Sequence, residues 1–196
     1  ITILTIIAKI PTEKVERNLK QAMLYYKENL AEITMIKEDR EYSYLHPYAD
    51  EIILNIIKCL DTEKPLSSVL EARYYTSSKD DKSNLKYIEL MANDYEGNTE
   101  YMRYWHGSII FIKPLLILFT LEEIYIINAV ILGILLIILI SMLIKKGFLG
   151  IAISFIIAII MSAIWYVPFT FEYIWNFYIM IIASIISIII ETKHSE

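Results

Sequence analysis

A short run of aromatic and basic residues near the middle of the chain has the residue types of a phosphate-binding site. Arg103 and His106 flank Tyr104 and Trp105, and Lys113 follows in an apolar stretch. Arginine and lysine bind phosphate oxygens through charge-assisted hydrogen bonds, and cations at a membrane surface attract anionic groups held at that depth. We therefore predict that Arg103 and Lys113 bind a lipid-linked phosphate, with Tyr104 and Trp105 in the same pocket.

The aromatic residues of this run also have a simpler interpretation. Tyr and Trp side chains are enriched at the membrane surface, where one edge of the ring is apolar and the other is in contact with water. In that interpretation Tyr104 and Trp105 anchor the chain at the level of the lipid headgroups, and His106 is an interfacial histidine without a catalytic role.

Asp50 is the residue that we predict to act as a general base. It lies near His46 and several tyrosines, and a carboxylate can accept the proton that an attacking hydroxyl loses. His106 would orient the phosphate or donate a proton, and Glu172, among aromatic residues, is a further pocket candidate. The competing interpretation places Asp50 in the first turn of a helix, where an acid complements the helix dipole, and pairs it with Arg103.

The sequence carries no motif for a metal ion or another cofactor. CxxC, HExxH and paired-histidine spacings do not occur, and neither do the glycine-rich loops that bind nucleotides. A divalent metal on Asp50 would be chemically reasonable, but no spacing supports it. Cys59 is the only cysteine, and its apolar neighbours predict a small core residue rather than a nucleophile.

Beyond residue 120 the sequence is almost entirely apolar. The whole chain is 56% hydrophobic and has a mean hydropathy of +0.47. Three windows without a charged residue exceed the length of about 17 residues that a membrane crossing requires. They predict transmembrane helices over residues 124–144, 148–167 and 174–190 within residues 121–196, and an integral membrane protein whose partner is the lipid bilayer.

Basic residues in the short loops predict the orientation of these helices. Lys145 and Lys146 separate the first two spans, and Lys193 follows the third, so both positions are assigned to the cytoplasm. Residues 9–120 are then extracytoplasmic in a multi-pass protein of the cell membrane. Residues 1–8 read as the end of a truncated transmembrane helix, which predicts a fragment that lacks its N-terminal anchor. The acidic balance of the chain gives no reason to expect nucleic acid as a partner.

The sequence before the spans predicts an all-α domain over residues 9–107. Apolar residues recur at helical spacing, whereas the alternation and tight Asn-Gly turns of strands are missing. Residues 108–120 are too short to cross a bilayer and contain Lys113, so we predict an interfacial or re-entrant helix there. The helices expected in the domain cover residues 12–37, 47–60, 66–75 and 83–97, the last closed by Gly97.

The run from Arg103 to Gly107, followed by Lys113-Pro114-Leu115-Leu116, resembles a motif of uncharacterised multi-pass membrane proteins of Gram-positive bacteria. The segment from Tyr48 to Asn55 is similar to a second element of that group, and the resemblance covers roughly the whole chain. Lys113 stands where the group has arginine, which keeps the charge but loses bidentate geometry. The resemblance implies membership of the group and no established activity.

The expected architecture is also similar to the start of the C-type glycosyltransferases, which use lipid-phosphate sugars. That similarity implies a transferase that takes a polyprenyl-phosphate-linked sugar at the outer membrane face and modifies a cell-surface glycan. Asp50 would then assist the acceptor hydroxyl, while Arg103 and Lys113 stabilise the leaving phosphate. The alternative is a non-catalytic membrane protein whose extracytoplasmic domain binds a partner or a cell-envelope polymer. An open pocket shared by these residues favours chemistry, and burial of the same groups favours the alternative.

Overall fold

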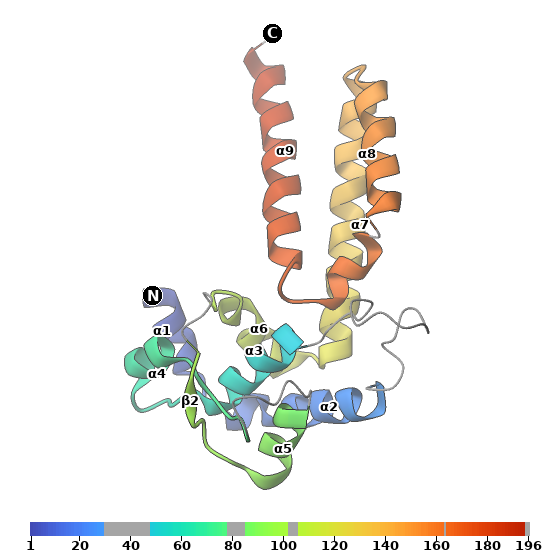
Figure 1. Ribbon diagram of the computed structural model, residues 1–196. Coiled ribbons are helices and arrows are strands. Elements are labelled where there is room, and N and C mark those ends of the chain that lie inside the picture. Colours follow the sequence, from blue (N-terminus) through green and yellow to red (C-terminus); the bar gives the residue numbers. More distant parts are fainter. Residues whose placement is uncertain (30–47, 78–84, 102–105, 163, 195–196) are drawn as a thin grey trace. The chain divides into compact units, whose positions relative to one another are not determined.

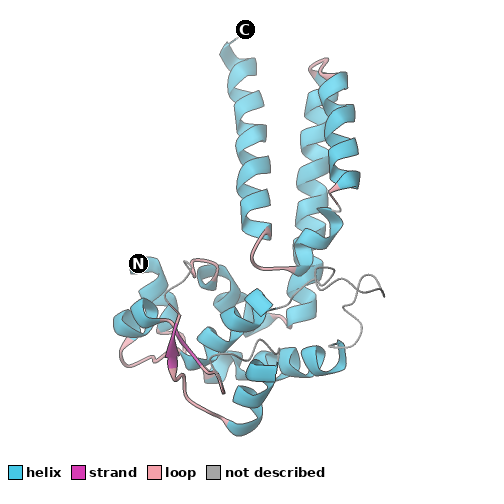
Figure 2. Cartoon of the chain, in the orientation of Figure 1, coloured by secondary structure: helices cyan, strands magenta, loops and turns pink. Residues whose placement is uncertain are grey.

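The computed structural model describes residues 1–29, 48–77, 85–101, 106–162 and 164–194. Within these residues the chain is mostly helical, with one short pair of strands, which agrees with the predicted all-α class (Figure 2). It divides into two compact units, an N-terminal unit, Ile1–Ile124, and a C-terminal unit, Tyr125–Glu196. Each unit has its own packing and is described by itself.

The N-terminal unit is built from short amphipathic helices (Figure 1). Helix α2 packs against α3, α5 and α6, and α1 packs against α4 and α6. The helices are α1 Thr2–Ala8, α2 Glu13–Asn29, α3 Tyr48–Cys59, α4 Pro65–Glu71, α5 Leu85–Asn93 and α6 Ile109–Leu118.

Helix α2 confirms the apolar stripe expected from the sequence. Val15, Leu19 and Ala22 have no exposed surface, and the side chain of Tyr26 is 1% exposed. Their spacing of three and four residues places them on one face, which the neighbouring helices cover. The expected continuation of the stripe to Lys37 lies outside the described residues.

The segment after α4 differs from the all-helical prediction. Instead of continuing as a helix to Tyr75, the chain forms strand β1, Arg73–Tyr74, which pairs antiparallel with β2, Thr99–Glu100. Ala72 ends α4 in the left-handed conformation, with a φ of 43°. The Asn55 side chain accepts a hydrogen bond from the Tyr75 amide at 2.8 Å and donates one to its carbonyl at 3.0 Å, which holds the extended backbone.

The spacing of apolar residues in the sequence predicts a stripe of Leu85, Ile88, Met91 and Tyr95 for helix α5, and Met91 is buried as expected. The buried face also includes Tyr87 and Leu90, each with no exposed surface, which that pattern does not contain. Tyr87 is accommodated in the core because its hydroxyl donates a hydrogen bond of 2.8 Å to the carbonyl of Leu19. The helix ends at Asn93, so Tyr95 lies beyond it and remains 45% exposed.

Gly97 does not cap α5, as the sequence suggested, but allows two segments to approach closely. A Cβ atom at this position would lie 2.9 Å from the Cβ of Arg73 and 3.1 Å from the Cβ of Cys59. Such distances leave no room for a side chain without movement of the neighbours. The lack of a side chain at Gly97 therefore sets how near the α5 end lies to α3 and β1.

The C-terminal unit contains two helices that are long and apolar enough to cross a membrane. Thr120 and Glu123 close the N-terminus of the first one as a capping box, the arrangement that the spacing of the two residues predicts, with hydrogen bonds of 2.8 and 3.3 Å. The elements are α7 Leu121–Lys145, α8 Leu149–Met161, the 3-10 helix η1 Ile164–Phe169, and α9 Ile174–His194, where α7 and α9 are the two long helices.

The predicted span over residues 148–167 is shorter in the structure. Its α-helix, α8, has 13 residues and ends at Met161, and the 3-10 helix follows. Pro168 lies inside this 3-10 helix, several residues beyond the end of α8. A helix of 13 residues covers about 20 Å, less than the hydrocarbon core of about 30 Å.

Helices α7 and α9 contact each other through a stripe of apolar side chains. Leu132 and Leu139 of α7 form a buried cluster with Ile174 and Ile181 of α9, so both helices contribute residues seven positions apart. The Tyr178 hydroxyl of α9 donates a hydrogen bond of 3.0 Å to the side-chain oxygen of Asn128 on α7. The outward faces of both helices are apolar, as suits a lipid environment, and Ile134, Ile137 and Ile179 are more than half exposed.

Candidate functional site

The structure describes four of the predicted site residues, namely Asp50, Lys113, Glu172 and His106. Asp50 lies in the first turn of α3, as predicted, but is only 1% exposed. Lys113 has no exposed surface, and its Nζ donates a hydrogen bond of 3.2 Å to the carbonyl of Ala8. Glu172 is exposed and belongs to the C-terminal unit. Arg103, Tyr104 and Trp105 lie outside the described residues.

His106 is the fourth described residue, and it is half-buried. Its ring lies 5.7 Å from the ring of Tyr101, and burial lowers the pKa of the imidazole. The imidazole is therefore held toward its neutral form, which suits an interfacial histidine as well as a hydrogen-bonding one. The described part of the structure does not show the four residues lining one open cavity.

The buried groups instead belong to a polar interior of the N-terminal unit. Asn18 donates a hydrogen bond of 2.8 Å to the carbonyl of Leu116, while Glu51 is 4% exposed. Burial, and secondarily the neighbouring Asp50, raises the pKa of Glu51 to about 8, so this carboxyl group is largely protonated at neutral pH. Burial likewise lowers the pKa of Lys113 to about 8. These positions support the structural interpretation of Asp50 and Lys113 that the sequence left open.

A different site is open on the N-terminal unit. It is a hollow of about 640 Å³ between the C-terminal end of α3, helix α4 and the segment after α5. Its wall is mostly polar and combines serine hydroxyls with acidic and basic groups. The lining residues, which we call the α3–α4 pocket, are Lys58, Cys59, Asp61, Lys64, Ser67, Ser68, Glu71, Arg73, Asp94, Tyr95, Glu96 and Gly97.

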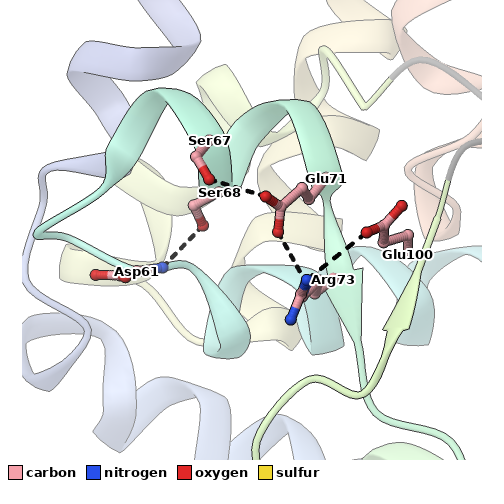
Figure 3. A network of polar contacts seen from close by, with 6 residues as sticks. All are labelled: Asp61, Ser67, Ser68, Glu71, Arg73 and Glu100. Carbon is pink, nitrogen blue, oxygen red and sulfur yellow. Dashed lines mark hydrogen bonds and ion pairs between the residues drawn. The ribbon is translucent and has the colours of Figure 1, made fainter.

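Hydrogen bonds fix one wall of the α3–α4 pocket (Figure 3). Oδ1 of Asp61 accepts from the amides of Glu63 and Lys64 at 2.8 and 3.3 Å, a turn that this short side chain favours. The Asp61 amide donates to Oγ of Ser68 at 2.8 Å, and Oγ of Ser67 donates to Glu71 at 2.9 Å. The loop and α4 are thereby held together with both serine side chains at the pocket.

Most charges of the pocket are already paired. Nε of Arg73 lies 2.8 Å from Oε2 of Glu71, and its guanidinium also lies 3.6 Å from Glu100 on the neighbouring strand. Nζ of Lys58 lies 2.8 Å from Asp94, and this hydrogen bond lowers the pKa of that carboxyl group. The pairs give the pocket fixed donors and acceptors with little net charge.

Cys59 lies in the pocket wall but is not positioned as a nucleophile. Its thiol is 3.6 Å from the side-chain oxygen of Asn55. Burial raises the pKa of the thiol to about 12, so the reactive thiolate is not populated at neutral pH. This agrees with the structural role predicted from the sequence.

Sequence reasoning did not find this pocket because its residues come from two separated segments, 58–73 and 94–97. Asp61 and Glu96, for example, are 35 positions apart, and neither belongs to a motif with a fixed spacing. The sequence does contain one signal of the pocket. Polar residues are concentrated just after α3 and α5, where the C-termini of these helices expose backbone carbonyl groups. The pairing of β1 with β2, the packing of α3 against α5 and the ion pair of Lys58 with Asp94 bring these two ends together.

The comparisons with known proteins identify no relative on which a function could rest. The chain matches no family model, no curated protein and no solved structure. By its fold, the chain is a mostly helical protein with a folded N-terminal unit and two helices that are long and apolar enough to cross a membrane.

Proposed function

We propose that this chain is a multi-pass protein of the cell membrane whose N-terminal unit lies outside the cytoplasm and binds a cell-envelope polymer. The observation that carries the proposal is the α3–α4 pocket, an open polar hollow of about 640 Å³. Its sidedness rests on Lys145 and Lys146, which follow the first span and favour the cytoplasm.

The chemistry of the pocket suits a neutral or weakly charged polymer rich in hydroxyl groups. Ser67, Ser68 and the paired side chains offer hydrogen-bond donors and acceptors at fixed positions. The ring of Tyr95 stacks on Tyr75 with 4.7 Å between centroids, so a rigid aromatic surface stands at the edge. A strongly anionic polymer fits less well, because the basic groups Arg73 and Lys58 are already bound to carboxylates.

The transferase hypothesis ranks second because its proposed groups are enclosed. A general base must reach the hydroxyl that it deprotonates, and a phosphate-binding cation must reach the phosphate. Asp50 is 1% exposed and Lys113 is not exposed, so both would have to move before they could touch a substrate. The binding proposal requires no such rearrangement.

Exchange of two pocket charges tests the binding proposal. Lys64 and Glu96 are exposed, and neither forms an ion pair with another described residue. We expect the double variant Lys64→Glu, Glu96→Arg to weaken binding to purified peptidoglycan at least about tenfold, since the exchange replaces a hydrogen-bond donor by an acceptor at one position and an acceptor by a donor at the other. Binding is measured by cosedimentation of the full chain in detergent with peptidoglycan sacculi.

A matched exchange outside the pocket provides the control for this experiment. Lys14→Glu with Glu28→Arg changes two exposed charges of α2 and leaves the net charge the same. The control variant should bind like the wild type and melt at the same temperature as the pocket variant. Equal binding by all three proteins, or no binding by any, would overturn the proposal.

A further inference from the structure

Helix α6 has an arrangement opposite to that of a helix in water. Its one charged residue, Lys113, points inward and has no exposed surface. Its outward residues are apolar, with Phe111 51% exposed and Leu118 70% exposed. In a soluble unit the charged side chain would take the outer position and the large apolar groups would be covered.

Helix α1, which packs against α6, has the same character. It contains no charged residue, and Leu4 and Ala8 face the core of the unit. Ile3 and Ile6 point away from the core and are each 60% exposed. Figure 1 shows α1 and α6 at one end of the N-terminal unit and α5 at the other.

The short link between α6 and α7 restricts what can cover the exposed apolar side chains of α1 and α6. Leu118 ends α6 and Leu121 begins α7, so the two positions can be no more than about 11 Å apart. Glu122 and Glu123 stand in the first turn of α7, and the charge-free apolar stretch begins at Ile124. If α7 crosses a bilayer, its charged first turn lies at the lipid surface, and the end of α6 must lie there too.

We propose that α1 and α6 form a lipid-docking face, through which the folded N-terminal unit rests on the bilayer that α7 enters. The face consists of Ile3, Ile6, Phe111 and Leu118, and its occupant is the acyl and headgroup boundary of the membrane. Insertion of large apolar side chains into that boundary is the usual mode of interfacial helices. This inference rests on the proposed membrane insertion of α7 and adds a second site of contact.

Docking in this way would keep the α3–α4 pocket close to the membrane. Helix α4 packs against α1 and exposes Leu66 and Leu70, at 51% and 54%, on one side. Its residues Ser67 and Glu71 line the pocket. A helix with its side chains is about 10–12 Å wide, so the polymer bound in the pocket would lie within roughly one helix diameter of the lipid.

Fluorescence quenching by lipids tests the docking face in the full chain. Single cysteines are introduced by Phe111→Cys or Ile3→Cys in a Cys59→Ala background, labelled with an environment-sensitive dye, and the protein is reconstituted into phosphatidylcholine and phosphatidylglycerol vesicles. We expect vesicles with nitroxide-labelled acyl chains to reduce the emission at both positions at least about twofold, because the dye lies among the chains. Asn93→Cys, the exposed last residue of α5, should show little quenching.

A label on α7 separates failure of the inference from failure of the proposed function. Ile134 is 52% exposed on α7 and should be quenched in any membrane-spanning arrangement. Quenching at Ile134→Cys without quenching at Phe111→Cys or Ile3→Cys would overturn the docking face alone. A dye at Phe111→Cys that is shielded by a second copy of the chain, and not by lipid, would overturn it as well. Absence of quenching at all positions would contradict the membrane insertion itself.

Discussion

Replacement of Leu19 with alanine is expected to destabilise the N-terminal unit by about 2–5 kcal/mol, because it leaves a cavity among α2, α5 and their neighbours. Leu19 has no exposed surface and belongs to the central stripe of α2. The backbone carbonyl of Leu19 also accepts a hydrogen bond from the hydroxyl of Tyr87. A movement of the backbone that filled the cavity would therefore disturb this hydrogen bond. Hydrogen exchange of the amides of α2, measured by mass spectrometry in detergent, reports the loss directly.

Leu24 on the same helix provides the matched control. Its side chain is 48% exposed, so Leu24→Ala removes the same atoms without opening a cavity. We expect a change of about 0.5 kcal/mol or less from this variant. Similar protection in Leu19→Ala and Leu24→Ala would contradict the core described for the N-terminal unit.

The stability of the same unit should fall as the pH rises from about 5 to about 8. Burial, followed by the repulsion of Asp50, raises the pKa of Glu51 from 4.5 to about 8. Between these two values the folded chain binds more protons than the unfolded chain, so a higher pH favours unfolding. The contribution is at most about 1.4 kcal/mol for each pH unit in this window and is fully present below the lower value.

Glu51→Gln should remove this dependence, since the amide does not ionise. The variant is expected to match the wild type near pH 5 and to be more stable near pH 8, as measured by thermal unfolding across the range. Glu63→Gln, at an exposed position in the same unit, should leave the pH profile unchanged. Equal stabilities of the wild type and Glu51→Gln at pH 8, as well as at pH 5, would mean that Glu51 is not buried in its neutral form.

Features of the fold that depend on local sequence were predictable. The apolar stripe of α2 and the capping box formed by Thr120 and Glu123 follow from spacings of three and four residues. The long apolar helices α7 and α9 follow from composition alone. Each of these signals is contained within one or two turns of helix or in one uninterrupted window, so no knowledge of distant contacts is needed.

The position of Lys113 shows why the candidate site was not predictable. A lysine in an apolar segment beside Arg103 indicates a membrane surface, and the sequence offers no sign that its ammonium is enclosed. Its hydrogen-bond acceptor is the carbonyl of Ala8, 105 positions earlier in the chain. The α3–α4 pocket has the same origin, because the β1–β2 pairing and the Lys58–Asp94 ion pair join segments that lie far apart in the chain. Contacts of this range leave no periodic pattern in the sequence.

Cysteine labelling in intact cells is the most direct test of the claim that the α3–α4 pocket lies on the extracytoplasmic side of the membrane. In a Cys59→Ala background, Lys64→Cys places a thiol at the rim of the pocket and Lys146→Cys places one after α7. The account predicts that a membrane-impermeant maleimide labels Lys64→Cys in intact cells and labels Lys146→Cys only after permeabilisation. Labelling of Lys146→Cys in intact cells, with Lys64→Cys protected until the cells are opened, would contradict it.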